Sequence, residues 1–279
     1  MLQLTQHDYK HLADGLLACV LSAGSLQMRY HGSDIAVIAK PDASPVTAAD
    51  HESETVLLSG LATVAPNIPV VAEERAASGF IPKVGDCYFA VDPLDGTKDF
   101  IAGRPEFTIN IGLICNREPV FGLIYAPALS SMFLTTAAGE AAYCHIPPNA
   151  LVSSFAECRF ERLRTRQPEP GALRALTSRS RPSETSTAFL HRAGVSEQQP
   201  TGSSLKFCLI AQARADVYAR FGPTNEWDTA AGQAILTAAG GAVVTLDDKP
   251  FLYGKVESKF LNPQFIAWGR RPAGDVPNT

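Results

Sequence analysis

Four acidic residues have the type and the spacing of a metal site. Asp92 and Asp95 flank a Pro-Leu pair directly after a strand-like apolar segment, and Gly96 follows them. Proline and glycine at these positions favour a tight turn, which can bring both carboxylates to one side of the chain. Glu73 also follows a short apolar segment, and Asp228 precedes a run of small residues. Because Mg²⁺ prefers oxygen ligands, the four side chains are candidate magnesium ligands.

Spacing alone leaves simpler interpretations of these residues open. Asp92 suits the cap of an ordinary acidic turn, and Asp228 suits the N-cap of a helix. If all four carboxylates converged, they would repel one another strongly, since one pair of charges about 4 Å apart repels by ~4 kcal/mol at an effective dielectric of 20. A converged cluster would therefore need divalent cations at neutral pH.

The apolar pattern predicts the elements that position these residues. Two helices are expected in the first part of the chain, at 7–30 and 48–64. Short strands are expected before the acidic residues, at 70–72 and 88–91. An antiparallel meander is expected to follow them, with strands at 108–115, 120–125 and 132–136. Later helices are expected at 183–193, 204–213 and 228–239, and later strands at 217–219, 242–246 and 265–268.

Residues 146–170 are rich in proline, serine and arginine, which is typical of a boundary between two parts of a chain. We therefore expect a mixed α+β fold in two halves. Residues 1–157 would carry the acidic motif, and residues 158–279 would complete the metal site and bind the substrate. Within the boundary, residues 159–166 alternate arginine with other residues, and we expect a solvated edge strand rather than a surface for nucleic acid.

Composition limits the class of protein. The chain has 279 residues, of which 46% are hydrophobic, so it is long enough to bury a large core. A formal net charge of −4 argues against a nucleic-acid polymer as partner. The six cysteines lack metal-ligand spacing and are expected to be reduced thiols. The sequence shows no signal peptide and no apolar run of membrane-spanning length, so we expect a cytoplasmic protein, with peripheral contact to the inner membrane left open.

Three segments together resemble the signature motifs of the inositol monophosphatase superfamily: residues 71–74, 92–100 and 227–232. The resemblance covers nearly the whole chain in the same order. It implies a layered α/β/α/β/α sugar-phosphatase fold and Mg²⁺-dependent, lithium-sensitive hydrolysis of phosphate monoesters. It also implies a set of metal ligands, which are the side chains of Glu73, Asp92, Asp95 and Asp228 and the carbonyl of Leu94.

The same resemblance assigns roles to two further residues. Residues 44–50 are similar to the family segment whose aspartate supports the threonine of the acidic turn. Asp50 and Thr97 would then form a hydrogen-bonded pair that orients the attacking water, and this pair with Glu73 would accept its proton. Taken without the resemblance, Asp50 is an exposed residue of a helix.

Cationic residues near the acidic motif suggest a substrate with more than one phosphate. Lys98 lies directly beyond the acidic turn, and Arg220 precedes Asp228 by eight residues. The segment 202–206, Gly-Ser-Ser-Leu-Lys, leads into an expected helix, where N–H groups, hydroxyls and a lysine can bind phosphate. Each feature has a simpler alternative: Lys98 suits a solvated loop, and Gly-Ser-Ser suits a capped loop before a helix.

Four segments resemble the bacterial 3′(2′),5′-bisphosphate nucleotidases of this superfamily: residues 40–42, 96–100, 202–207 and 220–225. The resemblance implies a small-molecule nucleotide substrate, 3′-phosphoadenosine 5′-phosphate (PAP), hydrolysed to AMP and phosphate in sulfur assimilation. Ser203, Ser204, Lys206 and Arg220 would hold the 5′-phosphate, while the metals hold the 3′-phosphate. The sulfated relative PAPS is an alternative substrate.

One loop departs from the nucleotidase pattern. Residues 177–181 resemble a segment that usually reads Ser-Arg-Ser-His, and Arg181 stands where histidine is expected. Ser178 and Arg181 are nevertheless candidate substrate contacts, because an arginine can bind phosphate or stack on adenine.

Two other functions remain as alternatives. An inositol or sugar-phosphate phosphatase would use the same acidic site, but the cation-rich segments argue against it. A regulatory or RNA-associated protein could keep the fold without depending on catalysis. The intact set of acidic residues argues against that second alternative.

Overall fold

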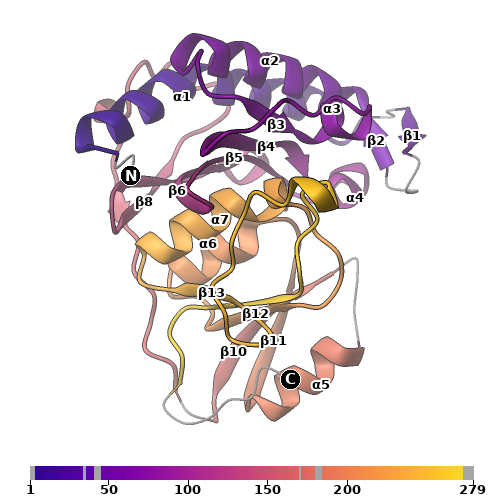
Figure 1. Ribbon diagram of the computed structural model, residues 1–279, viewed down its shortest axis with the longest axis vertical. Helices are drawn as coiled ribbons and strands as arrows, with labels where there is room; N and C mark the ends of the chain where they lie inside the picture. Colours follow the sequence, from indigo (N-terminus) through magenta and orange to yellow (C-terminus); the bar gives the residue numbers. More distant parts are fainter. Residues whose placement is uncertain (1–3, 34–35, 41–44, 170, 180–183, 273–279) are drawn as a thin grey trace.

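The computed structural model describes residues 4–33, 36–40, 45–169, 171–179 and 184–272. These residues form five layers, α/β/α/β/α, as the resemblance implied (Figure 1). From one side to the other the layers are a helix pair, a seven-stranded sheet, a second helix pair, a five-stranded sheet and one outer helix. The division of the chain into the halves 1–157 and 158–279 stays a prediction.

The large sheet has the strand order β3-β4-β5-β6-β7-β8-β9. Only β3 and β4 run parallel, and every other neighbouring pair is antiparallel. The strands are β3 (Val70–Ala72), β4 (Cys87–Asp95), β5 (Thr108–Cys115), β6 (Glu118–Ala126), β7 (Ser131–Ala137), β8 (Glu140–His145) and β9 (Glu161–Arg162). The expected meander is therefore confirmed. The edge strand β9 is exposed and falls within the arginine-rich segment, as predicted.

Helices α1 (Gln6–Tyr30) and α2 (Ala48–Val64) cover the outer face of this sheet (Figure 1). Both begin with a capping box, in which Thr5 pairs with Asp8 and Thr47 pairs with Asp50. Their apolar side chains pack on the strands that carry the acidic motif. The sequence predicted both helices because their apolar residues recur at helical spacing.

The middle layer contains α6 (Leu205–Ala211) and α7 (Glu226–Ala238). Helix α7 packs very closely on the large sheet, because a Cβ at Gly112 or Gly122 would lie 2.7 or 2.3 Å from the backbone of Ala231. Helix α7 was expected to begin at Asp228, but it begins two residues earlier, after the N-cap residue Asn225. The close packing carries the first turn of α7 to the acidic end of β4.

The small sheet has the order β11-β10-β12-β14-β13. Its strands are β10 (Leu173–Ser178), β11 (Val195–Thr201), β12 (Val217–Arg220), β13 (Ala242–Thr245) and β14 (Phe265–Trp268). Helix α5 (Glu184–Arg192) lies on its outer face, where Phe189 packs against Trp268. The sequence predicted the last three strands and missed the first two.

The remaining elements are short. They are β1 (Val37–Ala39), β2 (Pro45–Thr47), α3 (Glu73–Ala77), α4 (Thr97–Ile101), and the 3₁₀ turns η1 (Pro127–Leu129), η2 (Phe155–Glu157) and η3 (Val256–Ser258). Strands β1 and β2 pair as a separate antiparallel ribbon beside α4.

The expectation of six reduced thiols was wrong for two of them. Cys87 on β4 and Cys115 on β5 form a disulfide across the two strands. The antiparallel register pairs these residues directly, with their Cα atoms 4.2 Å apart. Only the register reveals this proximity, because 28 residues separate the two cysteines in sequence. Cys19, Cys144, Cys158 and Cys208 are free, and two of them are fully buried.

Candidate functional site

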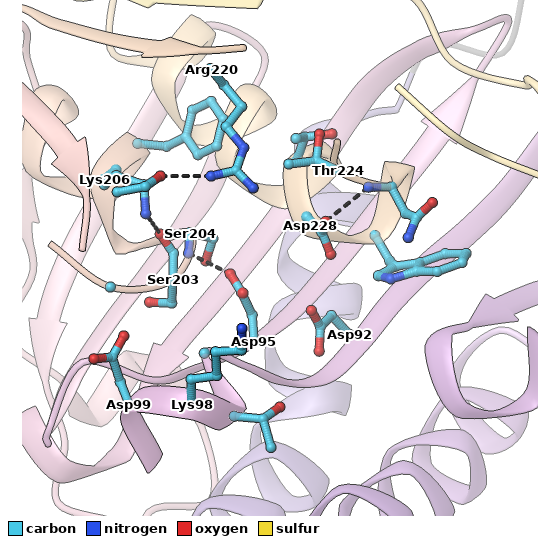
Figure 2. A pocket seen from close by; sticks show the side chains of 18 of the residues that line it. Asp92, Asp95, Lys98, Asp99, Ser203, Ser204, Lys206, Arg220, Thr224 and Asp228 are labelled. Carbon is cyan, nitrogen blue, oxygen red and sulfur yellow. Dashed lines mark hydrogen bonds between the residues drawn. The ribbon is translucent and has the colours of Figure 1, made fainter. Parts of the chain in front are cut away.

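Three of the predicted metal ligands converge on one point. Oxygen atoms of Glu73, Asp92 and Asp228 all lie within 4.8 Å of one another. Glu73 opens α3 directly after β3, Asp92 lies near the end of β4, and Asp228 is in the first turn of α7. Residues far apart in the sequence therefore meet where strands β3 and β4 end. Figure 2 shows Asp92, Asp95 and Asp228 pointing toward the same space.

A β-bulge brings Asp95 to the same side as Asp92. In a regular strand, residues three apart face opposite sides of the sheet. Here Asp92 pairs with Asn110 and Asp95 pairs with Thr108, so three steps on β4 match two on β5. The extra residue returns Asp95 to the side that Asp92 faces. The carboxylates were expected to converge through a turn, and the structure adds this bulge to the tight Gly96 bend, where φ is 94°.

Burial and the charges of neighbouring carboxylates raise the pKa values of the three aspartates in this cluster. The pKa of Asp92 lies well above its ordinary value, first because of desolvation and then because of the charges of Glu73, Asp95 and Asp228. Desolvation, with repulsion from Asp95 and Glu73, raises the pKa of Asp228 to about 8. The pKa of Asp95 is raised mainly by desolvation. A cluster that resists ionisation is stabilised by a cation of high charge.

The donor set fits a hard divalent cation. All the candidate ligand atoms are oxygens, from four carboxylates and the Leu94 carbonyl, and the Asp92 side chain is almost completely buried. Carboxylate oxygens without nitrogen or sulfur ligands are typical of Mg²⁺ and Mn²⁺ sites. The residues predicted as ligands therefore suit the metal that the resemblance implied.

Lys40 is a cation beside the cluster that the sequence analysis did not assign to the metal site. Its ammonium donates to Glu73 Oε1 at 2.7 Å and to Glu74 Oε1 at 2.6 Å. Despite desolvation, these two carboxylates raise the pKa of Lys40 above its ordinary value. In contrast, desolvation and the charge of Glu73 raise the pKa of Glu74 to about 7. Lys40 therefore offsets part of the negative charge of the cluster.

Asp50 and Thr97 lie together, as expected. Thr97 Oγ1 lies 3.2 Å from both Asp50 Oδ1 and the Leu94 carbonyl. Asp50 is buried rather than exposed, and its other oxygen accepts hydrogen bonds from the Thr47 N–H and hydroxyl. Desolvation raises its pKa. The capping box of α2 thus fixes the carboxylate that contacts Thr97.

A cavity of about 570 Å³ extends from the carboxylates toward the small sheet. Most of the residues expected to contact substrate line it: Lys98, Ser178, Ser203, Ser204, Lys206 and Arg220. Lys98 is exposed at its rim. The cationic side chains of Lys206 and Arg220 lie across the cavity from Asp92 (Figure 2). One cavity therefore contains an anionic end and a cationic end.

Lys206 is buried, and its ammonium donates to the carbonyls of Thr201 and Ser203. It also lies 5.0 Å from the centre of the Tyr218 ring. Desolvation lowers its pKa to about 8, against the opposing attraction of Asp95. Lys206 thereby holds the loop 202–204 in shape while it adds positive charge to the cavity wall.

Arg220 is fixed by three hydrogen bonds. Nη1 donates to Ser178 Oγ at 2.7 Å, Nε to the Gly222 carbonyl at 3.2 Å, and Nη2 to the Pro223 carbonyl at 3.0 Å. A guanidinium has five N–H donors. Two of them have no partner among the described residues, and a phosphate can accept both.

The two serines of the segment 202–206 differ in environment. Ser204 uses its N–H for Asp95 Oδ2 and its hydroxyl for Asn110 Oδ1 at 2.6 Å. Ser203 is in the left-handed region with φ 48°, and its Oγ accepts a 3.3 Å hydrogen bond from the Leu205 N–H. The two serines therefore shape the loop as well as line the cavity.

Arg181 lies outside the described residues. Its neighbour Arg179, to which the sequence analysis gave no role, lines the cavity and pairs with Asp99 and Glu106. The sequence analysis also missed Asn110, whose contact with Ser204 joins positions 94 residues apart. No local pattern signals such a contact.

Comparisons with known proteins agree with this geometry. The family model described as "Inositol monophosphatase family" matches residues 3–266. The chain belongs to the inositol monophosphatase family. Members of this family to which the chain is similar include the 3′(2′),5′-bisphosphate nucleotidase CysQ of Shigella flexneri, 40% identical over 91% of this chain and 98% of that protein. The corresponding protein of Salmonella typhimurium is 43% identical over 81% of this chain and 86% of that protein.

Solved structures of the inositol monophosphatase family share the fold. The crystal structure of CysQ from Bacteroides thetaiotaomicron matches with a TM-score of 0.76 and 32% identity, covering 94% of this chain and 98% of that one. An inositol monophosphatase of Thermotoga maritima matches with a TM-score of 0.68 and 25% identity, covering 91% and 90% of the two chains. The chain is thus an enzyme of a family of metal-dependent phosphatases. None of its described helices has the length and apolar composition that spanning a membrane requires.

Proposed function

We propose that this chain is a Mg²⁺-dependent 3′(2′),5′-bisphosphate nucleotidase that hydrolyses the 3′-phosphate of PAP to give AMP and phosphate. The observation that carries the proposal is the single cavity with a carboxylate cluster at one end and Lys206 and Arg220 at the other. The relatives at about 40% identity bear the name of this activity. The choice of Mg²⁺ rests on the all-oxygen donor set.

The reacting phosphate would lie at the carboxylate end. Glu73, Asp92, Asp95, Asp228 and the Leu94 carbonyl would hold the metal, which supplies a Lewis acid that activates water and neutralises charge on the phosphoryl group. Thr97 Oγ1 is close to both Leu94 O and Asp50, so its hydroxyl can orient the attacking water. Asp50 fixes that hydroxyl, and its raised pKa suits a group that shares a proton with Thr97.

The second phosphate would lie at the cationic end. Ser178 and two backbone carbonyls hold the Arg220 guanidinium in place, so its remaining N–H groups have a fixed orientation. A phosphate bound there stays attached through the reaction, and its binding energy positions the other phosphate for attack. A site that binds one phosphate at each end would favour a bisphosphate over a substrate with a single phosphate.

The test compares PAP with adenosine 3′-phosphate, which lacks the second phosphate. We expect the wild-type enzyme to have a higher kcat/KM for PAP. Arg220→Gln should lower kcat/KM for PAP by about tenfold to a hundredfold, since a hydrogen bond between charged groups contributes ~1.5–3 kcal/mol. The same variant should change the value for adenosine 3′-phosphate little. Equal losses on both substrates would contradict the assignment of the second phosphate to Arg220.

A further inference from the structure

The loop 202–206 is attached to the metal-site strands through Ser204. Its N–H donates to Asp95 Oδ2, a contact drawn as a dashed line in Figure 2. Its hydroxyl donates to Asn110 Oδ1 at 2.6 Å and lies 2.9 Å from Thr108 Oγ1. One residue of the cationic end therefore contacts both a candidate metal ligand and the strand beside it.

The register of the sheet explains why these groups meet. Thr108 is opposite Asp95 and Asn110 is opposite Asp92, on adjacent strands. Thr108 and Asn110 are two residues apart on β5, so their side chains face the same side of the sheet. Ser204 lies over this pair, and the side chains of all three residues are buried.

The loop is also packed tightly against the acidic turn. A Cβ at Gly202 would lie 2.5 Å from Asp99 Oδ2 and 2.6 Å from the Glu106 carbonyl, so only glycine fits there. Ser203, the next residue, has φ 48°. A left-handed conformation of a residue other than glycine is strained and persists only where its surroundings fix it. Ser204 and Lys206 provide that fixation, from the sheet and from within the loop.

The side-chain amide of Asn110 accepts the Ser204 hydrogen bond through its oxygen. Its Nδ2 is buried without a hydrogen-bond partner in the described part of the chain. Ser204 therefore holds the Asn110 side chain through its amide oxygen.

We propose that Ser204, Thr108 and Asn110 form a positioning unit that fixes Asp95 for metal binding and fixes the loop 202–206 relative to it. Asp95 is the contact with the metal, and the three polar residues act through it. The hydroxyl of Ser204 therefore serves the metal ligand and not the phosphate. The metal part of this inference stands on the geometry alone, and its link to the second phosphate rests on the proposed function.

The test is the affinity of the metal-free protein for Mg²⁺ alone, measured by isothermal titration calorimetry without substrate. Ser204→Ala keeps the N–H to Asp95 but removes the hydroxyl that holds it in place. Changes to groups that orient metal ligands weaken metal binding by about 10- to 100-fold. We expect a loss in this range for Ser204→Ala.

Thr108 provides a second variant and a conservative rescue. Thr108→Val removes the hydroxyl at nearly constant volume and should weaken Mg²⁺ binding several-fold, while Thr108→Ser should keep the wild-type affinity. Thr135→Val is the matched control, because Thr135 is an equally buried threonine on β7 whose hydroxyl accepts from the Gly122 N–H at 3.1 Å. It should leave Mg²⁺ affinity unchanged.

Wild-type Mg²⁺ affinity in folded Ser204→Ala and Thr108→Val would overturn the inference. If Ser204→Ala does not fold, the Mg²⁺ affinities of Thr108→Val and Thr108→Ser decide the question. The preference for PAP over adenosine 3′-phosphate is measured separately, and it should fall in Ser204→Ala. A wild-type protein that binds Mg²⁺ but releases no phosphate from PAP would refute the proposed function, while the metal titration would still decide the positioning role.

Discussion

Replacing Asp92 by asparagine should stabilise the metal-free protein at alkaline pH. Asp92 is almost completely buried beside Glu73 and Asp228, and oxygen atoms of the three side chains lie within 4.8 Å of one another. Asparagine keeps the size of the side chain and the Oδ1 that accepts from the Leu94 N–H at 2.9 Å. The substitution therefore removes one negative charge with little change in packing.

The sign of the pH dependence follows from the raised pKa values. A carboxyl with a raised pKa in the folded state binds a proton that the unfolded chain releases. This proton uptake stabilises the folded protein fully below the ordinary carboxyl pKa of about 4. The stabilisation is lost as pH rises through the pKa of the folded state, which is about 8 for Asp228. The wild-type protein without metal should therefore lose stability between pH 5 and pH 9.

The repulsion energy that Asp92→Asn removes follows from the distance between the carboxylate oxygens. Two charges at this distance repel by about 3 kcal/mol at an effective dielectric of 20. Asp92 has two such neighbours, but incomplete ionisation of the cluster limits the net gain to about one pair. With an unfolding entropy of ~2.1 cal/mol/K per residue, about 3 kcal/mol corresponds to roughly 5 °C in melting temperature for a chain of this length.

The assay is thermal unfolding in EDTA at pH 5, 7 and 9, repeated with Mg²⁺. Asp92→Asn should melt roughly 5 °C above wild type at pH 9 and close to it at pH 5, by the same conversion, and it should gain far less from Mg²⁺. The control is Asp86→Asn, an exposed aspartate just before the same strand, which should match wild type. A variant that is less stable than wild type at pH 9 would refute the repulsion argument.

Three further predictions concern other parts of the molecule. Thr97→Val should lower kcat by at least about tenfold while the Mg²⁺ affinity stays within a few-fold of wild type, because the Thr97 hydroxyl, which Asp50 holds, orients the attacking water. An unchanged kcat would exclude that role. Reduction of the Cys87–Cys115 disulfide should lower stability by about 3–4 kcal/mol for a loop of this length, and thiol titration of the denatured, unreduced protein should find four thiols rather than six. Tyr88→Phe should destabilise the protein by about 1–3 kcal/mol in urea unfolding, because the Tyr88 hydroxyl donates a hydrogen bond to the fully buried Glu226 and its removal takes one partner from that carboxylate. A decrease in the free energy of unfolding below about 0.5 kcal/mol would contradict this.

The sequence predicted the elements that have a strong apolar period. Helix α2 was expected at its observed bounds, and the meander strands were expected within two residues of theirs. Strand β11 was missed because its residues, Val195–Thr201, are polar and mostly exposed, so they carry no alternating pattern. Strand β10 was missed because it lies between a proline-rich segment and residues that suggested a loop.

The candidate site was predictable where a motif lies on one short segment. One short segment carries Asp92, Asp95 and Thr97. The resemblance added Glu73 and Asp228 from other segments. The contacts that join segments were not predictable, because they depend on register and on packing. Lys40 on Glu73, Ser204 on Asn110 and the disulfide are examples, and in each case the partners are at least 28 residues apart.

The central claim is that one cavity binds a metal at its carboxylate end and a second phosphate at its cationic end. The most direct test measures phosphate release from PAP and from inositol 1-phosphate, each with Mg²⁺ and with EDTA. The account predicts Mg²⁺-dependent release from PAP with a kcat/KM about a hundredfold or more above that for inositol 1-phosphate, equivalent to ~3 kcal/mol of binding to the second phosphate. Equal or better release from inositol 1-phosphate, or release from PAP that persists in EDTA, would contradict it.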